Sequence, residues 1–299
     1  MISVKPGIVS QAFPIWIIDK IRQSLLFPSP AANENVMQPV NGHLCKERAL
    51  MNFVKTEIKE GIATVVLQRG KVNALNDAVI NELRSCLQDL EKDKDTHAII
   101  LTGSGSFFSF GFDVPEFLSY TKAAFAAFIA NFTDFHTYLF LYPKPVVAAL
   151  NGHTIAGGCM LAIACDHRVM AAGKGKIGLN EIAFGAAVFA SSTEILRFLA
   201  GSANAARILY SGSMYPPEEA TRLGLVDEVT SESDLLVKAG TIARDMASKP
   251  APAFAAIKSL LRKPAIDEAL RREKATIEAF VEIWYSESTW KNLQEIKIR

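Results

Sequence analysis

The sequence predicts an α/β core followed by a helical tail, and three observations carry this prediction. Short apolar strand patterns alternate with helical patterns between residues 53 and 171, an order typical of α/β architecture. Strand patterns nearly vanish after about residue 188, where helical patterns follow one another. The 299 residues are 49% hydrophobic and 21% charged, which suits a globular protein with a large buried core.

The core begins with two strand patterns, Phe53–Ile58 and Ile62–Leu67, which Lys59-Glu60-Gly61 joins as a predicted hairpin. A helix is predicted next over Asn76–Asp93, because Asn76 can cap its N-terminus and the apolar residues share one face. Those apolar residues are Ile80, Leu83, Leu87 and Leu90.

The alternation continues and then gives way to helices. The next predicted elements are the strand Ala98–Leu101, the helix Ala123–Tyr142, the strand Pro145–Leu150, the small-residue helix Ala156–Ala164 and the strand His167–Ala171. The predicted tail helices are Ser191–Ala200, Ala203–Ser211, Pro217–Leu223, Ser233–Ala247, Ala251–Leu261 and Asp267–Tyr285.

Composition excludes several kinds of function. The formal net charge is +1, so no global field marks the chain for nucleic acid or for an anionic membrane, although local basic residues can still bind a phosphorylated ligand. The longest apolar run, Ala123–Leu141, is interrupted by polar residues, so we expect no membrane span. The four cysteines show no CxxC pair and no metal spacing, so we expect reduced, mostly buried thiols and no metal site: Cys45, Cys86, Cys159 and Cys165.

Residues 1–50 differ from the rest by their five prolines and weak periodicity. We expect an N-terminal extension there, either partly disordered or packed on the surface. Its apolar segment Phe13–Phe27 lacks a basic region followed by a clean small-residue cleavage site, so no signal peptide is expected. The expected organisation is an extension at 1–50, an α/β core at 51–240 and a helical, oligomerising region at 241–299.

Three segments carry residues suited to chemistry, and each has a plainer explanation. Phe107–Asp113 follows a buried strand, and its glycine turn can expose backbone N–H groups at a helix start, but a simple strand-to-helix turn explains it too. Asn151–Met160 contains Gly157-Gly158, which allows close approach of a ligand or, alternatively, tight helix packing. Glu181 lies within an otherwise apolar stretch, so it is either surface-exposed or a desolvated acid with a raised pKa.

The order and type of these segments resemble the crotonase, or enoyl-CoA hydratase/isomerase, superfamily from about Asn52 to the C-terminus. The resemblance is specific at Gly70–Asn76, Phe107–Asp113, Asn151–Asp166 and Gly178–Glu181. Within the superfamily the chain is most similar to mitochondrial-type Δ3,Δ2-enoyl-CoA isomerases. The resemblance implies a crotonase-like spiral of ββα units with a C-terminal helical region, assembled as a homotrimer or a hexamer. It also implies no cofactor, because coenzyme A is part of the substrate.

The resemblance also implies how the site works. The backbone N–H groups of Phe112 and Gly157 correspond to an oxyanion hole for a thioester enolate, and Glu181 to the catalytic base. The family's hydratases carry a second carboxylate where this chain has Met160. The implied reaction is therefore isomerisation of 3-enoyl-CoA to 2-trans-enoyl-CoA in fatty-acid β-oxidation, with Glu181 moving a proton from C2 to C4.

Further substrate contacts follow from the same resemblance. Lys71, Val72 and Ala74 are expected near the nucleotide end of coenzyme A, and Asp113 and Gly158 belong to the two glycine turns. Asn180 either orients Glu181 or shapes its turn. Lys258 is a candidate phosphate partner, from the same or a neighbouring subunit, or else lies on a solvated helix face. An acyl tunnel, or alternatively aromatic core, is expected from Phe110, Phe112, Phe184, Val188 and Phe189.

Two other interpretations stay open. The chain could be another acyl-CoA enzyme of the superfamily, such as a hydratase, thioesterase, decarboxylase or ring-processing enzyme. It could also be an oligomer that binds acyl-CoA without turning it over, with tail residues such as Phe280 and Trp284 in an interface or in the core. The expected compartment is the cytoplasm for a bacterial source and the mitochondrial matrix for a eukaryotic one.

Overall fold

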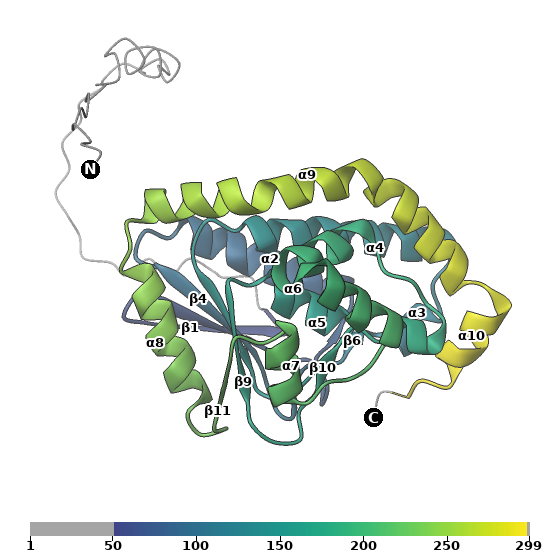
Figure 1. The fold of residues 1–299 in the computed structure, drawn as a ribbon, viewed down its shortest axis with the longest axis horizontal. Coiled ribbons are helices and arrows are strands. Elements are labelled where there is room, and N and C mark those ends of the chain that lie inside the picture. The colour runs from purple at the N-terminus through teal and green to yellow at the C-terminus, as the bar shows by residue number, and fades with distance from the viewer. Residues whose placement is uncertain (1–50, 298–299) are drawn as a thin grey trace, which may run out of the picture. The chain divides into compact units, whose positions relative to one another are not determined.

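The computed structural model describes residues 51–297, while residues 1–50 and 298–299, with the expected N-terminal extension, lie outside the description (Figure 1). The main sheet has six strands, in spatial order β1 (Val54–Lys59), β2 (Ile62–Leu67), β4 (Ala98–Gly103), β7 (Val146–Leu150), β9 (His167–Ala171) and β11 (Glu228–Thr230). β1 and β2 pair antiparallel, which confirms the predicted hairpin, and the other neighbours pair parallel.

Both faces of the central strands of this sheet are buried. In β4, Ile99 and Leu101 enter the larger hydrophobic core, whereas Ala98 and Ile100 enter a smaller core on the opposite face. Successive side chains of a strand point to opposite faces, so a strand covered on both sides must be apolar throughout. This is why residues Ala98–Leu101 of β4 and all of β7 are continuous apolar runs in the sequence.

Helices cover the two faces. α8 (Leu235–Ala247) closes the smaller core with Leu235, Ala239 and Ala243. The larger core takes in the buried faces of α2 (Asp77–Lys92) and α4 (Lys122–Leu141). The predicted cap of α2 is confirmed, because the Asn76 side chain accepts a hydrogen bond from the Val79 N–H at 3.1 Å.

Two small sheets carry the loops that follow the strands. One has three parallel strands, β10 (Ile177–Gly178), β8 (His153–Ile155) and β5 (Phe107–Ser109), with β8 in the middle. The other pairs β3 (Ala74–Leu75) with β6 (Gly111–Phe112). Strands of two or three residues have no periodic pattern, so none of them was predicted. They lead into the short helices α3 (Val114–Phe117), α5 (Gly157–Ala164) and the 3₁₀-helix η2 (Glu181–Phe184).

The tail is helical as predicted, with one correction. It contains α6 (Ala190–Ser211), α7 (Pro217–Leu223), α9 (Ala251–Trp284) and α10 (Glu287–Gln294), the last not predicted. The expected interruption of α6 lies at Gly201, whose backbone is non-helical. The prediction of separate helices at Ala251–Leu261 and Asp267–Tyr285 is wrong, because α9 continues through Pro264.

Burial on both sides of Pro264 explains why α9 is not broken there. Pro264 lacks an N–H and interrupts the helix hydrogen-bond ladder. Arg262 before it and Ile266 after it are buried, at 8% and 2% exposure, so tertiary packing holds both halves in line. Figure 1 shows α9 running over α2, α4 and α6 and then bending toward α10.

The boundary expected at residue 240 falls inside α8, and the described residues belong to one compact unit. No helix between residues 51 and 297 is long and apolar enough to cross a membrane.

A buried ionic cluster fastens α9 to the core. The Asp166 carboxylate accepts from the Lys258 ammonium at 2.7 Å and pairs with the Arg262 guanidinium at 2.9 Å. All three side chains are less than a tenth exposed. Arg262 also donates to the carbonyl oxygens of Phe140 and Ala164, at the C-terminal ends of α4 and α5. Two cations therefore share one carboxylate at the point where three helices meet.

Replacement of Asp166 by Asn is expected to destabilise the protein strongly. Two buried cations would lose their counter-charge, which typically costs about 3–5 kcal/mol. The melting temperature should fall by about 10 °C in thermal denaturation. Asp267→Asn is the matched control, since Asp267 forms an exposed i,i+4 pair with Lys263 and should change stability by less than about 0.5 kcal/mol. An equal, small effect of both substitutions would contradict a stabilising cluster.

Candidate active site

The three segments singled out in the sequence meet at one edge of the three-stranded sheet. β5 leads into Phe110–Asp113, β8 into Gly157, and β10 into Glu181. Because all three strands are parallel and β8 lies between the others, their carboxyl ends lie side by side. The register of this small sheet therefore brings both glycine turns next to the acidic residue.

Glu181 is a buried acid. It is the first residue of η2 and is 5% exposed. Desolvation by burial raises the pKa of Glu181 to about 8. Its Oε2 atom is buried and has no hydrogen-bond partner among the described residues. Of the two explanations open at the sequence level, the desolvated acid is the one that the structure supports.

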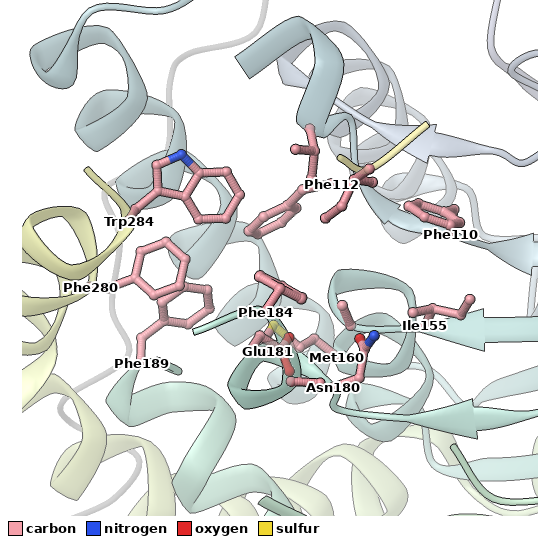
Figure 2. Close-up of a pocket in the computed structure, with 14 residues that line it drawn as sticks. Phe110, Phe112, Ile155, Met160, Asn180, Glu181, Phe184, Phe189, Phe280 and Trp284 are labelled. Carbon is pink, nitrogen blue, oxygen red and sulfur yellow. The ribbon is translucent and has the colours of Figure 1, made fainter. Parts of the chain in front are cut away.

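A cavity of about 300 Å³ lies in front of Glu181 (Figure 2). Glu181 is the only carboxylate among the described residues that line it, and Asn180 is the only other side chain there with a polar group besides the Trp284 indole. Met160 also lines the cavity and is 1% exposed. The complete lining is Phe110, Phe112, Val114, Ile155, Ala156, Met160, Asn180, Glu181, Ala183, Phe184, Phe189, Phe280, Trp284 and Ile296.

The turn before α5 leaves a backbone donor beside this cavity, which Ala156 lines. Ala156 has a φ of 49°, a left-handed conformation that non-glycine residues rarely adopt and that is typical of strained functional sites. It is held there by a 2.9 Å hydrogen bond from its N–H to the Gly178 carbonyl. Gly157 is then the first residue of α5, so its N–H has no acceptor within the helix and lies at the positive end of the helix dipole.

The second glycine turn packs directly on the first. Gly111 has a φ of +93°, and a Cβ there would lie 2.7 Å from the Ile155 carbonyl oxygen and 3.0 Å from the Gly157 nitrogen. Only glycine fits this approach. The Asp113 N–H donates to the Leu75 carbonyl oxygen in β3. Successive N–H groups of a strand point to opposite sides, so the N–H of Phe112 points away from β3.

The structure brings some predicted contacts to the cavity and removes others. Asn180 lines it, and its Oδ1 is buried without a hydrogen-bond partner among the described residues. An amide oxygen cannot donate to a carboxylate, so this atom does not orient Glu181. Phe110 also lines it. Asp113 instead caps α3 and pairs with Arg69 at 2.5 Å. Gly158 packs on Ser109: a Cβ on Gly158 would lie 2.6 Å from the Ser109 carbonyl oxygen. This contact supports tight helix packing as the reason for a glycine at position 158.

The segment expected near the nucleotide lies beside the cavity but does not line it. Lys71 is exposed, whereas Val72 and Ala74 are buried at 7% and 2% exposure. The Phe110 N–H donates to the Val72 carbonyl at 2.9 Å, which places this segment at the Phe110 end of the cavity.

The interpretation of Lys258 needs correction. Its ammonium pairs with Asp166 and donates to the Lys144 carbonyl, and the side chain is 4% exposed. It borders a separate apolar groove with Phe198 and Leu261 rather than the cavity of Glu181. Within one subunit Lys258 is therefore not a phosphate ligand at this site. It is also not a solvated lysine, because its ammonium is buried and paired with the counter-charge of Asp166.

The aromatic side of the cavity comes partly from the tail, which sequence reasoning did not foresee. The expected Phe112, Phe184 and Phe189 line the cavity together with Phe280 and Trp284 of α9 and Ile296. Phe280 and Trp284 are each 1% exposed, so core packing within the chain accounts for them. No local sequence pattern distinguishes these cavity-lining residues of α9 from ordinary core residues, because they lie far along a long helix that begins away from the site.

Nothing in residues 51–297 suggests a metal site, because no three His, Cys, Asp or Glu side chains there are grouped to hold an ion. Cys159 and Cys165 are buried, as expected, and burial raises the pKa of both thiols. Cys45 lies outside the described residues.

Comparison with known proteins places these features in a family. A family model described as enoyl-CoA hydratase/isomerase matches residues 57–295. The mitochondrial enoyl-CoA delta isomerase 1 of Mus musculus is 32% identical over 243 residues, covering 81% of this chain and 84% of the mouse protein. A probable enoyl-CoA hydratase of Bacillus subtilis is 30% identical over 246 residues, covering 82% of this chain and 95% of that protein.

Solved structures agree with the expected fold. The crystal structure of human mitochondrial delta3-delta2-enoyl-CoA isomerase superposes with a TM-score of 0.76 at 31% identity, covering 81% of this chain and 95% of the human one. The expected crotonase-like fold with a C-terminal helical region is thereby confirmed.

Replacement of Glu181 by Gln is expected to stabilise the protein increasingly as pH rises. The carboxyl of the unfolded chain ionises near its ordinary pKa of 4.5, whereas the folded one holds its proton until about pH 8. The folded state therefore binds more protons across this window, so the wild type loses stability as pH rises through it. Melting curves at several pH values should show an E181Q advantage that grows between these pKa values and then levels off. A difference that is flat with pH would mean that the pKa of Glu181 is not raised.

Proposed function

The chain belongs to the enoyl-CoA hydratase/isomerase family, and we propose that it isomerises 3-enoyl-CoA thioesters to 2-trans-enoyl-CoA thioesters in fatty-acid β-oxidation. The proposal rests on one observation above all. Glu181 is the only carboxylate among the described residues that line the cavity. Met160 lines it too, and the sequence resemblance puts this residue at the position of the second acid of the family's hydratases.

The proposed chemistry begins at the thioester carbonyl. Removal of a proton from C2 places negative charge on the carbonyl oxygen. We assign the N–H groups of Phe112 and Gly157 as its two donors, since both glycine turns pack together and the Gly157 N–H lies at a helix N-terminus. Donors that are fixed before the reaction stabilise this charge without reorganising, and one such donor typically contributes about 3–4 kcal/mol.

Glu181 is proposed to move the proton. In its ionised form the carboxylate takes a proton from C2, and the electrons of the C–H bond delocalise over the dienolate. The resulting carboxylic acid returns the proton to C4, which leaves the double bond between C2 and C3. A pKa of about 8 suits a group that must both accept and donate a proton near neutral pH. The reaction needs no other reactant, and the apolar lining disfavours water.

Hydration is the main alternative, and hydratase names among the relatives keep it open. Adding water to a double bond requires a held water molecule, and a single carboxylate among apolar side chains holds water poorly. Assays of the purified full-length chain on 3-hexenoyl-CoA and on 2-hexenoyl-CoA separate the two reactions. We expect 3-hexenoyl-CoA to be converted to the conjugated 2-hexenoyl-CoA, and 2-hexenoyl-CoA itself to be consumed only slowly. Efficient hydration without double-bond migration rejects isomerisation, and no turnover of either points to a binding protein.

A homotrimer or hexamer is part of the same proposal. Apolar side chains that no part of the described chain covers lie on α9, including Ile257, Leu260 and Leu261 at 58%, 77% and 62% exposure. Such a patch is typical of a protein–protein contact. Contact with a neighbouring subunit would bury it.

Loss of the Glu181 carboxylate should abolish most turnover. We expect Glu181→Gln to lower kcat by about 10²–10⁴-fold, the usual contribution of a general base. Glu282→Gln is the matched control, because Glu282 is 71% exposed and pairs with Lys122 at the surface. In the wild type the base is the ionised form, so kcat/KM should rise with pH and level off above about pH 8. Undiminished activity of the E181Q variant would show that another group is the base.

A second acid at position 160 should shift the reaction toward hydration. Met160→Glu adds a second carboxylate to the cavity that Glu181 lines, so water can be held between two acceptors. We expect hydration of 2-hexenoyl-CoA to rise at least about tenfold relative to isomerisation, a change of about 1.4 kcal/mol in relative barrier. Met160→Gln has the same shape without the charge and should not gain hydration. A folded Glu variant with unchanged hydration would contradict the role given to Met160.

A further inference from the structure

We propose that the cavity is a closed-ended acyl pocket, and that an aromatic wall of Phe189, Phe280 and Trp284 restricts it to short and medium acyl chains. This inference rests on the proposed function for the identity of the ligand, an acyl-CoA thioester. It adds which lengths of acyl chain the site accepts and which residues set the limit.

The wall lies at the end of the cavity where the tail of the acyl chain must go. Figure 2 shows Phe110 and Ile155 on one side of Glu181 and the three wall residues on the other. The Phe110 end adjoins Val72, through the hydrogen bond from the Phe110 N–H, and Lys71 beside it is exposed. The bulky, charged coenzyme moiety needs that open end. With the thioester between the glycine turns and Glu181, the hydrocarbon chain therefore points at the wall.

The wall residues pack on one another. The ring centroids of Phe189 and Phe280 lie 5.0 Å apart, and those of Phe280 and Trp284 lie 5.7 Å apart. All three side chains are at most 1% exposed. They come from two elements that contact each other, the start of α6 and the end of α9. An acyl chain that reaches them meets a continuous aromatic surface.

A second layer of rings stands behind the wall. The Phe125 ring of α4 lies 4.5 Å from Trp284 and 6.1 Å from Phe280, and the Phe132 ring lies 6.2 Å from Phe189. Phe125 and Phe132 are fully buried. Protein interiors are close-packed and yield little, so the wall can retreat only if α4 or α9 moves. A chain longer than the pocket must therefore fold back or leave its end outside.

This geometry predicts a break in the dependence of binding on chain length. Each methylene buried in an apolar pocket should tighten binding by about fourfold. Once the chain end touches the wall, further methylenes gain nothing and begin to displace packed rings. Affinity should therefore rise with length, reach a maximum at short or medium chains, and then level off or fall.

Calorimetric binding of saturated acyl-CoAs to the full-length protein, from butanoyl-CoA to hexadecanoyl-CoA, tests the wall without relying on any turnover. We expect the break to occur before dodecanoyl-CoA, and kcat/KM for the matching 3-enoyl-CoAs to follow the same order. Affinity that rises without a break up to hexadecanoyl-CoA overturns the wall. Absence of binding by every acyl-CoA rejects the proposed ligand itself, which is a different failure.

Shortening one wall side chain should move the break. Phe280→Leu is expected to tighten binding of the first chain length beyond the wild-type maximum by about fourfold, because it opens room for about one methylene. Phe198→Leu is the matched control, since Phe198 lies outside the cavity and is 42% exposed. Phe189→Leu gives the same test from α6 if F280L does not fold. A break that stays in place in a folded wall variant overturns the assignment.

Discussion

The parallel register of the small sheet β5–β8–β10 is the constraint on which the site depends. Each of its strands is only two or three residues long, yet each delivers one part of the site. Parallel pairing aligns their carboxyl ends, so Phe112, Gly157 and Glu181 come together from distant parts of the chain. The close approach of Gly111 to Gly157 leaves no space for a side chain, which fixes the two turns against each other.

This arrangement is locally unfavourable, and the surrounding core compensates for it. Glu181 is buried without a counter-charge, Asn180 Oδ1 is unpaired within the described part of the chain, and Ala156 has a left-handed backbone. Such features persist only where the rest of the structure over-determines them. Here the supports include the hydrogen bond from Ala156 to Gly178 and the one from the Thr289 hydroxyl to the Gly185 carbonyl, which ties α10 to the end of η2.

α9 connects the stability of the fold to the shape of the site. Its N-terminal half is fastened by Lys258 and Arg262 to Asp166, and its C-terminal half supplies Phe280 and Trp284 to the cavity. The helix stays continuous through Pro264 because both halves are packed. Anchoring at one end therefore positions the aromatic wall at the other. The cavity in turn is apolar enough to keep Glu181 protonated near neutral pH.

The sequence by itself determined the α/β core, the α2 cap, the helical tail and the three segments of the site, because strands, helices and glycine turns leave local patterns. The sequence also showed that position 160 carries methionine instead of an acidic residue. Only the tertiary structure decided that Glu181 is buried, that Lys258 and Asp113 form ion pairs within the chain, and that the tail closes the cavity. Burial and ion pairing depend on which residues distant in the sequence come into contact. Strands of two residues, and a helix that continues through a proline, leave no periodic pattern in the sequence from which those contacts can be predicted.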